Sequence, residues 1–514
     1  MRHFAKKSAD PREVELKLQL PPGSRALIEA SSAFAAVKGR RLHQLTTYFD
    51  TPERELDRDG LTLRIRRIGK KHIQTVKSRD SGQGIASDRA EWEWPIRKNV
   101  PELARLAETP RLAKAARAVS GRLKAVFVTD IRRTVRLLKL NDGTWIEAAI
   151  DEGQIEAGPS REPVCELELE LKHGGIGAVY ELAATLLELA PMWVSAESKP
   201  SRGWFLRTGR VAGVQVFAMP KLGRRTRAVD AFNAIIAAIL GHLMANTGPM
   251  LRGDSEGLHQ MRKALRAMRA ALQLFANHLE REAPQRFNAQ LLHFGRIFGA
   301  ARDDDVLCLD TLPAAIAALP RGKIDKLLSV AEVRRRIPHA VAREAARGHD
   351  FTALVLGLAA WAQTGTAQPS SIGDDRMAAR LGSLAPSLLD RVARKAKRRG
   401  RNPGGLSVEE LHALRKSLKK LCCDVKFLGS LYRRRAVKAY CKRCNRVEVL
   451  LGTANDAVVA QRLASALVND GDGQPNLAKP ARALVQLSKR RRRRTLRGLV
   501  RAMRKFRAMP AFWS

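Results

Sequence analysis

Residues 12 to 205 carry charged side chains two positions apart, whereas the chain beyond residue 225 repeats its apolar residues at helical spacing. The first pattern recurs in EVELKLQL, TLRIRRI, HIQTVKS, EWEWPI, FVTDIRRTVRLL, WIEAAIDEG and CELELELK. Period-two runs separated by turn signals such as DRDG and NDG predict antiparallel strands. The change of period therefore predicts two folds in one chain, a sheet followed by helices.

The charged positions of the predicted strands are sorted by sign. Carboxylates gather in EVELK and CELELE, and cations gather in LRIRR and TVK. A sheet with one solvated face usually places apolar residues inward and mixed polar residues outward. A closed barrel with a charged interior would sort charges strand by strand, because each strand faces one part of the same cavity. We therefore expect an antiparallel β-barrel of seven or more strands.

Helical runs such as AVDAFNAIIAAILGHLM follow the strands. Between the two patterns we expect a linker at residues 206–224, which contains Pro220 and Gly223. The sequence thus predicts an α+β multidomain fold, with a barrel at 12–205 and an all-α unit at 225–514.

The helical unit contains an internal repeat. HQMRKALR at 259–266 corresponds to HALRKSLK at 412–419, and GAARD at 299–303 corresponds to GTAND at 452–456. In both pairs the second copy follows the first by 153 residues, so the spacing between the two motifs is the same in each half. We interpret this as a duplicated bundle with two equivalent basic faces.

A second break in the pattern, RKAKRRGRNPGG at 394–405, divides the helical part. We place the two halves of the repeat at about 225–393 and 406–514.

The charge of the chain implies a polyanionic partner. The 514 residues include 93 Lys and Arg against 51 Asp and Glu, a formal net charge of +42. Nucleic acid, an anionic membrane and inorganic polyphosphate all exchange counterions for Lys and Arg, so charge alone does not choose among them. Aromatic residues make up 5% of the chain and are absent from both basic motifs, so the stacking surfaces typical of nucleic-acid binding are missing. We therefore do not expect nucleic acid as a partner.

The location of the protein is predicted from what the chain lacks. The N-terminus has no signal-peptide core, and we find no run of about eighteen apolar residues that could span a bilayer. We expect a cytoplasmic protein that does not enter a membrane.

The six cysteines do not form a disulfide framework, and we interpret Cys441 and Cys444 as helical thiols and assign no zinc to them.

Two predicted strands carry grouped carboxylates. Glu13 and Glu15 alternate with Lys17 on one face of the first strand. A later strand repeats the pattern with Glu166, Glu168 and Glu170. Hard oxygen ligands of this kind suit Mg²⁺ or Mn²⁺.

The cations of the other strands would hold phosphate groups through charge-assisted hydrogen bonds. Arg64 and Arg66 share one face, Lys77 follows on the next strand, and alternation leaves either Arg132 or Arg133 facing the same interior. Positioning, charge neutralisation and a metal are what phosphoryl transfer requires.

These motifs resemble the CYTH superfamily of triphosphate tunnel metalloenzymes, whose ExExK motif stands here as EVELK at 13–17. Over residues 12–205 the likeness extends to TYFDT, LRIRR, TVK, RAEWEW, IDEG, ELELE and the late Ser198-Lys199. The resemblance implies an eight-stranded antiparallel barrel with a charged tunnel that acts on a linear triphosphate. Because the sequence shows no adenine or thiazole pocket, we expect inorganic triphosphate as the substrate.

The resemblance also implies roles for single residues, with Glu13, Glu15 and Lys17 as the catalytic motif. The implied metal ligands are Glu13, Glu15, Asp151, Glu166, Glu168 and Glu170. The implied phosphate ligands are Lys17, Arg64, Arg66, Lys77, Arg133 and Lys199. Arg133 is chosen over Arg132 because TDIRRTVR matches the family pattern in that register. Arg136 stands where the family often has an aromatic residue.

One face of each repeated helix is purely basic. The first stripe is His259, Arg262, Lys263, Arg266 and Arg269, within a sector of about 120°. The second stripe is His412, Arg415, Lys416 and Lys419, with Cys422 at the position equivalent to Arg269 and Lys426 one turn further on. Solvated faces normally mix signs, so stripes without an acid indicate a bound anion.

Residues 225–514 resemble a CHAD domain, on the paired HxxRK helices and the G-x-x-[RN]-D segments. This resemblance implies polyphosphate binding by both stripes. We expect Asp303 and Asp456 to orient neighbouring cations or cap a helix. KRRRRR at 489–494 leaves two interpretations open, a non-specific electrostatic surface and direct polyphosphate contact.

The expected function is metal-dependent hydrolysis of inorganic triphosphate by the barrel, with polyphosphate binding by the helices. The alternative is a non-catalytic polyphosphate-binding or granule-targeting protein. The intact EVELK and ELELE motifs favour the enzyme. Association with polyphosphate granules and the oligomeric state are left open.

Overall fold

The structure is a computed structural model that describes residues 11–79, 84–209, 213–279, 282–316, 325–364, 377–470 and 475–513. Residues 1–10 and, within the predicted linker, residues 210–212 lie outside the described residues. The chain forms two compact units. The first comprises Met1–Gln215, Met244–Arg252 and Ala346–Thr364, and the second comprises Val216–Leu243, Gly253–Ala345 and Gly365–Ser514.

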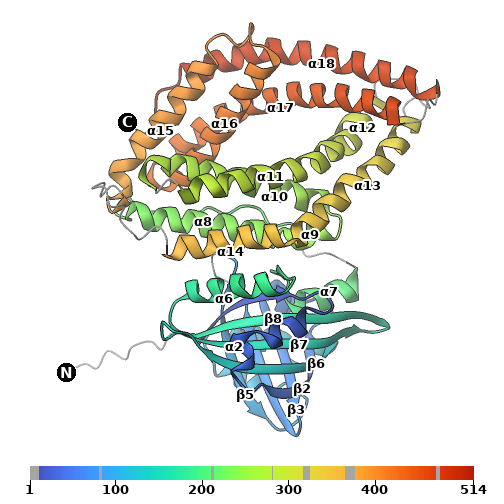
Figure 1. Cartoon of the computed structure of the whole chain (residues 1–514), viewed down its shortest axis with the longest axis vertical. Coiled ribbons are helices and arrows are strands. Elements are labelled where there is room, and N and C mark those ends of the chain that lie inside the picture. Colours follow the sequence, from blue (N-terminus) through green and yellow to red (C-terminus); the bar gives the residue numbers. More distant parts are fainter. Residues whose placement is uncertain are drawn as a thin grey trace. The chain divides into compact units, whose positions relative to one another are not determined.

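In the described part of the first unit, eight antiparallel strands close into a barrel (Figure 1). Their order is β5-β4-β3-β2-β6-β7-β8-β1, and β1 pairs with β5 to close the ring. The strands are β1 (Arg12–Gln19), β2 (Arg40–Asp50), β3 (Leu61–Ile68), β4 (Lys71–Ser78), β5 (Ser87–Ile96), β6 (Lys124–Lys139), β7 (Trp145–Ala157) and β8 (Ser160–His173); β9 (Trp193–Val194) adds to β1. The predicted antiparallel barrel is confirmed.

The strands are buried on both faces, which explains their sequence pattern. Leu16 and Leu18 of β1 and Leu167 and Leu169 of β8 are fully buried on the outer face, and the charged residues between them point into the barrel. Helices of the same unit supply the outer cover; α6 packs on β8, and α7 packs on β6, β7 and β8. The helices are α1 (Ser24–Ala30), α2 (Ser32–Ala35), α3 (Glu55–Arg58), α4 (Leu103–Ala107), α5 (Ala113–Val119), α6 (Ile176–Leu189), α7 (Lys199–Thr208), α9 (Thr247–Leu251) and α14 (His349–Thr364).

The second unit is helical, as the sequence predicts. Its elements are α8 (Ala228–Ala245), α10 (Ser255–Phe275), η1 (Ala276–His278), α11 (Glu282–Asp305), the π-helix η2 (Val306–Thr311), α12 (Leu312–Ile316), α13 (Asp325–Arg347), α15 (Leu381–Arg399), α16 (Val408–Leu428), η4 (Gly429–Leu431), α17 (Arg434–Asp470) and α18 (Pro475–Arg507).

Helix α8 corrects one expectation. The segment Ala228–Leu251 is long and apolar enough to cross a membrane, with a mean hydropathy of 1.7 in its most apolar window, although the sequence analysis found no such run. Phe232, Ile235 and Ile239 are fully buried in the second unit, and Phe232 packs edge-on against Phe275 of α10. The apolar character of α8 is therefore that of a core helix.

The duplication is visible in equivalent elements of the second unit. Helices α10 and α16 begin and end 153 residues apart, and so do the short helices η1 and η4 that follow them. The amide of Ala228 donates to the carbonyl of Ala379 at 2.9 Å, and the amide of Leu381 donates to the carbonyl of Thr226 at 2.8 Å. These two hydrogen bonds exchange equivalent residues, which is the contact pattern of a two-fold axis.

The equivalence also shows where the second half begins. Helix α15 starts 153 residues after α8, so it is the first helix of the second half. The predicted break at 394–405 therefore lies inside that half, over the end of α15 and the loop that precedes α16. The predicted start at residue 406 follows the more conspicuous interruption of the helical pattern, whereas the equivalence of α8 and α15 places the start near Leu381.

Gly153 provides a test of the barrel. It pairs with Ile131 across β7 and β6, and a Cβ atom there would lie 1.9 Å from the carbonyl oxygen of Asp130. Because that oxygen is backbone, relief requires the two strands to separate. We expect Gly153→Ala to lower the free energy of unfolding by about 3 kcal/mol or more, measured by urea denaturation with far-UV circular dichroism.

The matched control is Gly143→Ala in the turn between the same strands. Gly143 has φ +83° and open space around its Cβ position, so only backbone strain of about 1–2 kcal/mol is expected. Equal losses for the two variants would contradict the close strand approach.

Candidate functional site

The closed barrel encloses a cavity of about 240 Å³. Side chains from all eight strands of the ring and from the start of α7 line it. Ile131 and Pro200 are the apolar side chains among its described lining residues, and Tyr48 is the aromatic one. The interior is therefore a charged and polar chamber with little surface for a nucleobase or another apolar group.

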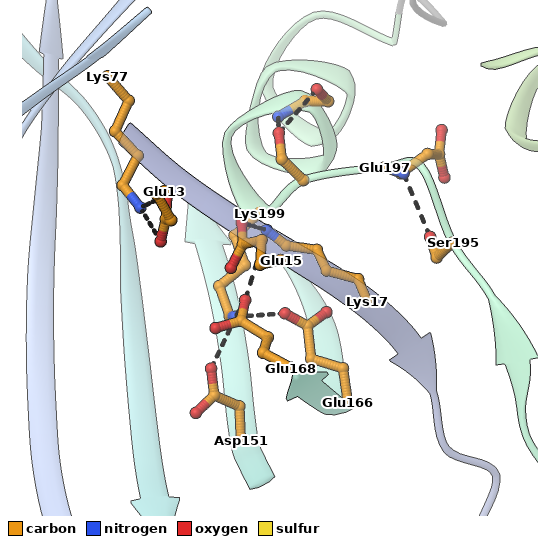
Figure 2. A network of polar contacts seen from close by, with 12 residues as sticks. Glu13, Glu15, Lys17, Lys77, Asp151, Glu166, Glu168, Ser195, Glu197 and Lys199 are labelled. Carbon is orange, nitrogen blue, oxygen red and sulfur yellow. Dashed lines mark hydrogen bonds and ion pairs between the residues drawn. The ribbon is translucent and has the colours of Figure 1, made fainter. Parts of the chain in front are cut away.

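Three carboxylates converge at one side of the chamber (Figure 2). Asp151 of β7 is paired in register with Glu166 of β8, and Glu168 lies two residues further along the same strand. One oxygen from each of the three lies within 4.8 Å of the others, and all three residues are buried. We refer to Asp151, Glu166 and Glu168 as the carboxylate triad.

Two cations hold the triad. Lys199 Nζ lies 2.7 Å from Asp151 Oδ2 and 3.0 Å from Glu168 Oε1, and it also bonds Glu166 Oε1. Arg133 donates from Nε and Nη2 to the two oxygens of Asp151, at 2.6 Å each, and also pairs with Glu168. Each carboxylate of the triad thus has a cationic partner in the free protein.

These contacts set the charge state of the group. Burial alone would raise the pKa of Asp151 and Glu168, but Lys199 and Arg133 hold both pKa values below their usual range. Burial opposes the charge of Lys199, yet the three carboxylates raise its pKa above the ordinary value. Asp151 and Glu168 are therefore ionised beside a protonated lysine.

Glu13 and Glu15 of β1 form a second carboxylate group. Lys77 Nζ donates to both oxygens of Glu13, at 2.8 and 2.6 Å, as Figure 2 shows. Arg89 Nε donates to Glu13 at 3.0 Å and its Nη2 bonds Glu15, while Lys17 Nζ donates to Glu15 at 2.6 Å. Burial would raise the pKa of Glu13 and Glu15, but these cations lower both.

The structure thus divides the six implied metal ligands. Asp151, Glu166 and Glu168 converge, whereas Glu13 and Glu15 are held by their own cations. Glu170 stands apart, because Lys172 Nζ pairs with it at 2.6 Å and burial raises its pKa. A single ion held by all six would require these partners to be rearranged.

Arg64, Arg66 and Lys77 line the chamber opposite the triad's strands. Nε of Arg64 and of Arg66 has no hydrogen-bond partner among the described residues, although both atoms are buried. Burial, Arg64 and Arg133 lower the pKa of Arg66 to about 10, and burial together with Arg64 and Arg89 lowers the pKa of Lys77 to about 8. Mutual repulsion of this kind would be relieved by an anion.

The structure separates the two arginines that the sequence left open. Arg133 points into the chamber, and Arg132 is exposed on the outer face of β6. Arg136 belongs to the wall, where it donates to the carbonyl of Val37 at 3.2 Å and lies over the ring of Phe34. An arginine stacked on an aromatic ring thus takes the place of the family's aromatic residue.

Several polar residues of the site were missed by the sequence analysis. Arg89, Glu91 and Glu93 line the chamber from β5, and their alternation in DRAEWEW is the signal that would have found them. Gln19 donates to Glu166 Oε2 at 2.9 Å and continues the alternation of Glu13, Glu15 and Lys17. Arg202, which also reaches Glu166, lies on a helix that period two does not cover.

The two basic stripes form a common cationic cluster in the second unit. Helices α10 and α16 pack together, and Arg266 lies close enough to Arg415 and Lys419 to affect the pKa of both. Burial, Arg266 and Arg415 lower the pKa of Lys419 to about 7. Asp303 lies 3.9 Å from Arg262, and the equivalent Asp456 offsets the charge of Arg415.

The two stripe histidines are neutral at pH 7. Burial, Arg302 and the stripe cations lower the pKa of His259 to about 4, and burial and Lys416 lower that of His412. His259 lies beside Arg302, and His412 bonds the side chain of Asn455, which is the equivalent position in the second half. The repeat therefore keeps the same neighbourhood around each histidine.

Other charged residues of the second unit have different partners. Arg269 faces α11, where its Nε donates to Asn288 at 3.0 Å. Lys263 is near Lys426, which is exposed. Asp305 pairs with Arg335 at 2.6 Å and with His339 at 2.8 Å. The run at 489–494 lies on α18 and is mostly exposed.

Comparisons with known proteins agree with this architecture. The CYTH domain model matches residues 11–203, and the CHAD domain model matches residues 234–465. A protein of Haemophilus influenzae named inorganic triphosphatase is 30% identical over 197 residues, which are 38% of this chain and 55% of that protein. The chain thus spans about half the length of this relative.

A crystal structure supports the helical fold. The CHAD domain of the plant Ricinus communis superposes with a TM-score of 0.50 and 24% identity, covering 58% of this chain and 98% of that one. Together the matches confirm both resemblances found in the sequence.

Arg132 and Arg133 offer a matched test of the chamber. Arg133→Met would leave Asp151 and Glu168 buried with one cation fewer, at a cost of about 3–5 kcal/mol in unfolding free energy. Arg132→Met removes an exposed charge and should cost no more than about 0.5 kcal/mol. Urea denaturation in the presence of EDTA measures both; a larger loss for Arg132→Met would show that the strand has the opposite register.

Proposed function

The chain carries a CYTH domain followed by a CHAD domain, and from this premise we propose that the barrel hydrolyses inorganic triphosphate with a divalent cation while the helical unit binds polyphosphate. The carboxylate triad carries the proposal, because it places three buried oxygen ligands beside several phosphate-binding cations in one closed chamber. The name of the Haemophilus influenzae relative supports the choice of reaction.

The triad fits Mg²⁺ or Mn²⁺. Both ions prefer hard oxygen donors and commonly use a few carboxylates together with substrate phosphate oxygens. Asp151, Glu166 and Glu168 would hold the ion, and their lowered pKa values keep Asp151 and Glu168 ready as ligands at neutral pH. When bound, the ion would neutralise phosphate oxygens and favour ionisation of the attacking water.

The cations of the chamber would position the substrate. Lys17 and Arg133 lie next to the triad and would hold the phosphate that is attacked. Arg64, Arg66 and Lys77 would hold the remaining phosphates. A phosphate oxygen would take the place of a carboxylate partner or offset the repulsion from a neighbouring cation. Hydrolysis consumes one water, breaks one P–O–P bond and releases orthophosphate and diphosphate.

The lining of the chamber favours a bare triphosphate over a nucleotide. A base or thiazole ring in the chamber would contact mainly charged and polar side chains, because Ile131 and Pro200 are the apolar lining residues described. Burying polar groups against an apolar ring costs free energy without a compensating hydrogen bond.

For the helical unit, the convergence of the two stripes supports polyphosphate as the ligand. Arg262, Arg415 and Lys419 lose part of their hydration to burial, and Arg266 lies close enough to repel all three. A linear chain of phosphates would offset several of these charges at once. A cytoplasmic location stays a prediction.

Triphosphatase activity is tested with Glu168→Gln, which keeps the size of a triad side chain but removes its charge. We expect phosphate release from inorganic triphosphate, with Mg²⁺ or Mn²⁺, to fall by at least about 100-fold. The control is Glu188→Gln on the exposed face of α6, which should match the wild type. No release above the protein-free background by any of the three proteins would favour the non-catalytic polyphosphate-binding alternative, and equal release above it would contradict the role of Glu168.

Polyphosphate binding should depend on pH through Lys419. A polyanion would raise its pKa from about 7, so binding takes up a proton and affinity rises as pH falls from 8 to 6, by up to about tenfold per unit. Lys419→Met should weaken this dependence, whereas Lys442→Met, at an exposed position of α17, should keep it. Fluorescence anisotropy with labelled polyphosphate measures both, and an unchanged slope in Lys419→Met contradicts the assignment.

A further inference from the structure

Lys199 lies at the centre of the carboxylate triad. Its Nζ lies 2.7 Å from Asp151 Oδ2 and 3.0 Å from Glu168 Oε1, and it bonds Glu166 Oε1 as well (Figure 2). The ammonium donates hydrogen bonds to Glu166 and Glu168 and forms an ion pair with Asp151, so all three carboxylates of the triad are its partners. The side chain is about 10% exposed, so water does not compete strongly for these donors.

The same oxygens would be needed by a divalent cation. The triad oxygens lie within 4.8 Å of one another, and Mg²⁺ requires its ligands at about 2.0–2.1 Å, which leaves no room for an ammonium among them. Lys199 and a divalent cation therefore exclude each other from the triad.

We propose that Lys199 is a resident cation, which occupies the metal position until a divalent cation displaces it and then binds substrate phosphate from the side of the chamber. The inference rests on the proposed function for the chemistry of the site. Lys199 lines the chamber and is the first residue of α7, so its side chain can turn from the triad to the chamber while the helix stays in place.

The start of α7 is anchored independently of the ammonium. The side chain of Ser198 caps the helix by accepting from the amide of Ser201 at 3.3 Å. Arg202, one turn along, donates from Nε to Glu162 at 2.7 Å and from Nη2 to the carbonyl of Pro163 at 2.6 Å. Displacement of Lys199 therefore leaves these anchors of α7 intact.

The triad also keeps partners when Lys199 leaves. Glu166 Oε2 retains Gln19 Nε2 at 2.9 Å and Arg202 Nη1 at 3.4 Å, and Asp151 retains both hydrogen bonds from Arg133. The carboxylates are thus held in position for a cation of higher charge.

A consequence is that metal and substrate bind cooperatively. The ammonium released from the triad gains a phosphate partner only when substrate is present. Lys199 can bind that phosphate only when a divalent cation neutralises the triad in its place. By linkage, each ligand strengthens the binding of the other by the same factor.

The test compares Mn²⁺ affinity, without any phosphate, in the wild type, Lys199→Met and Lys172→Met, by electron paramagnetic resonance of free Mn²⁺. Both variants remove one positive charge from the same chamber, but Lys172 pairs with Glu170 outside the triad. We expect Lys199→Met to bind Mn²⁺ at least about tenfold more tightly than the wild type, because no cation has to be displaced, and Lys172→Met within about threefold of it.

Unchanged or weaker Mn²⁺ binding by folded Lys199→Met would overturn the proposal, as would an equal gain in Lys172→Met. Thermal unfolding supplies a second measurement, because Lys199→Met lacks the charge that offsets three carboxylates. Its unfolding temperature should rise more on Mn²⁺ addition than that of the wild type. Failure to fold both with and without Mn²⁺ would also count against the proposal.

These outcomes are separate from the test of the proposed function. A wild type that releases no phosphate from triphosphate would refute the hydrolase, yet the relative Mn²⁺ affinities of the three proteins would still decide whether Lys199 occupies the metal position.

Discussion

Pairing of β1 with β5 is the contact on which the site depends, because it closes the sheet and removes its charged face from bulk water. An unpaired charge in such an interior costs several kcal/mol. Each carboxylate of the triad and of the β1 motif is accordingly bound by lysine or arginine from another strand or from α7. Closure therefore brings the alternating charges of separate strands into contact, and ion pairs with neighbouring side chains hold them in position.

This network explains how one chamber can be both stable and ready for a ligand. In the free protein Lys199, Arg133 and Lys77 neutralise carboxylates, so the interior is nearly balanced in charge. A divalent cation and a triphosphate bring opposite charges into the same space and could exchange partners with these ion pairs. The ligands would then meet charged groups that the barrel already holds in place, which is a form of preorganisation.

The electrostatics of the helical unit differ from those of the barrel, because its positive charge is only partly offset. Its duplication brings two purely basic stripes together, and Asp303 and Asp456 offset only part of that charge. Burial, together with the remaining repulsion, lowers the pKa values of Lys419 and of both stripe histidines. An anion bound beside these cations would reduce their mutual repulsion.

The sequence by itself determined which side chains share a face. Period two placed Glu13, Glu15 and Lys17 together, and the 153-residue offset revealed the repeat, because both patterns follow from local backbone geometry. It also left Arg132 and Arg133 unresolved from alternation alone, missed Arg202 on a helix, and began the second half of the repeat too late. Only the tertiary structure decided which faces meet: Asp151 beside Glu166, Arg89 beside Glu13, and Lys199 inside the triad. Strand order and barrel closure join residues that are far apart in the chain, and no local pattern specifies those partners.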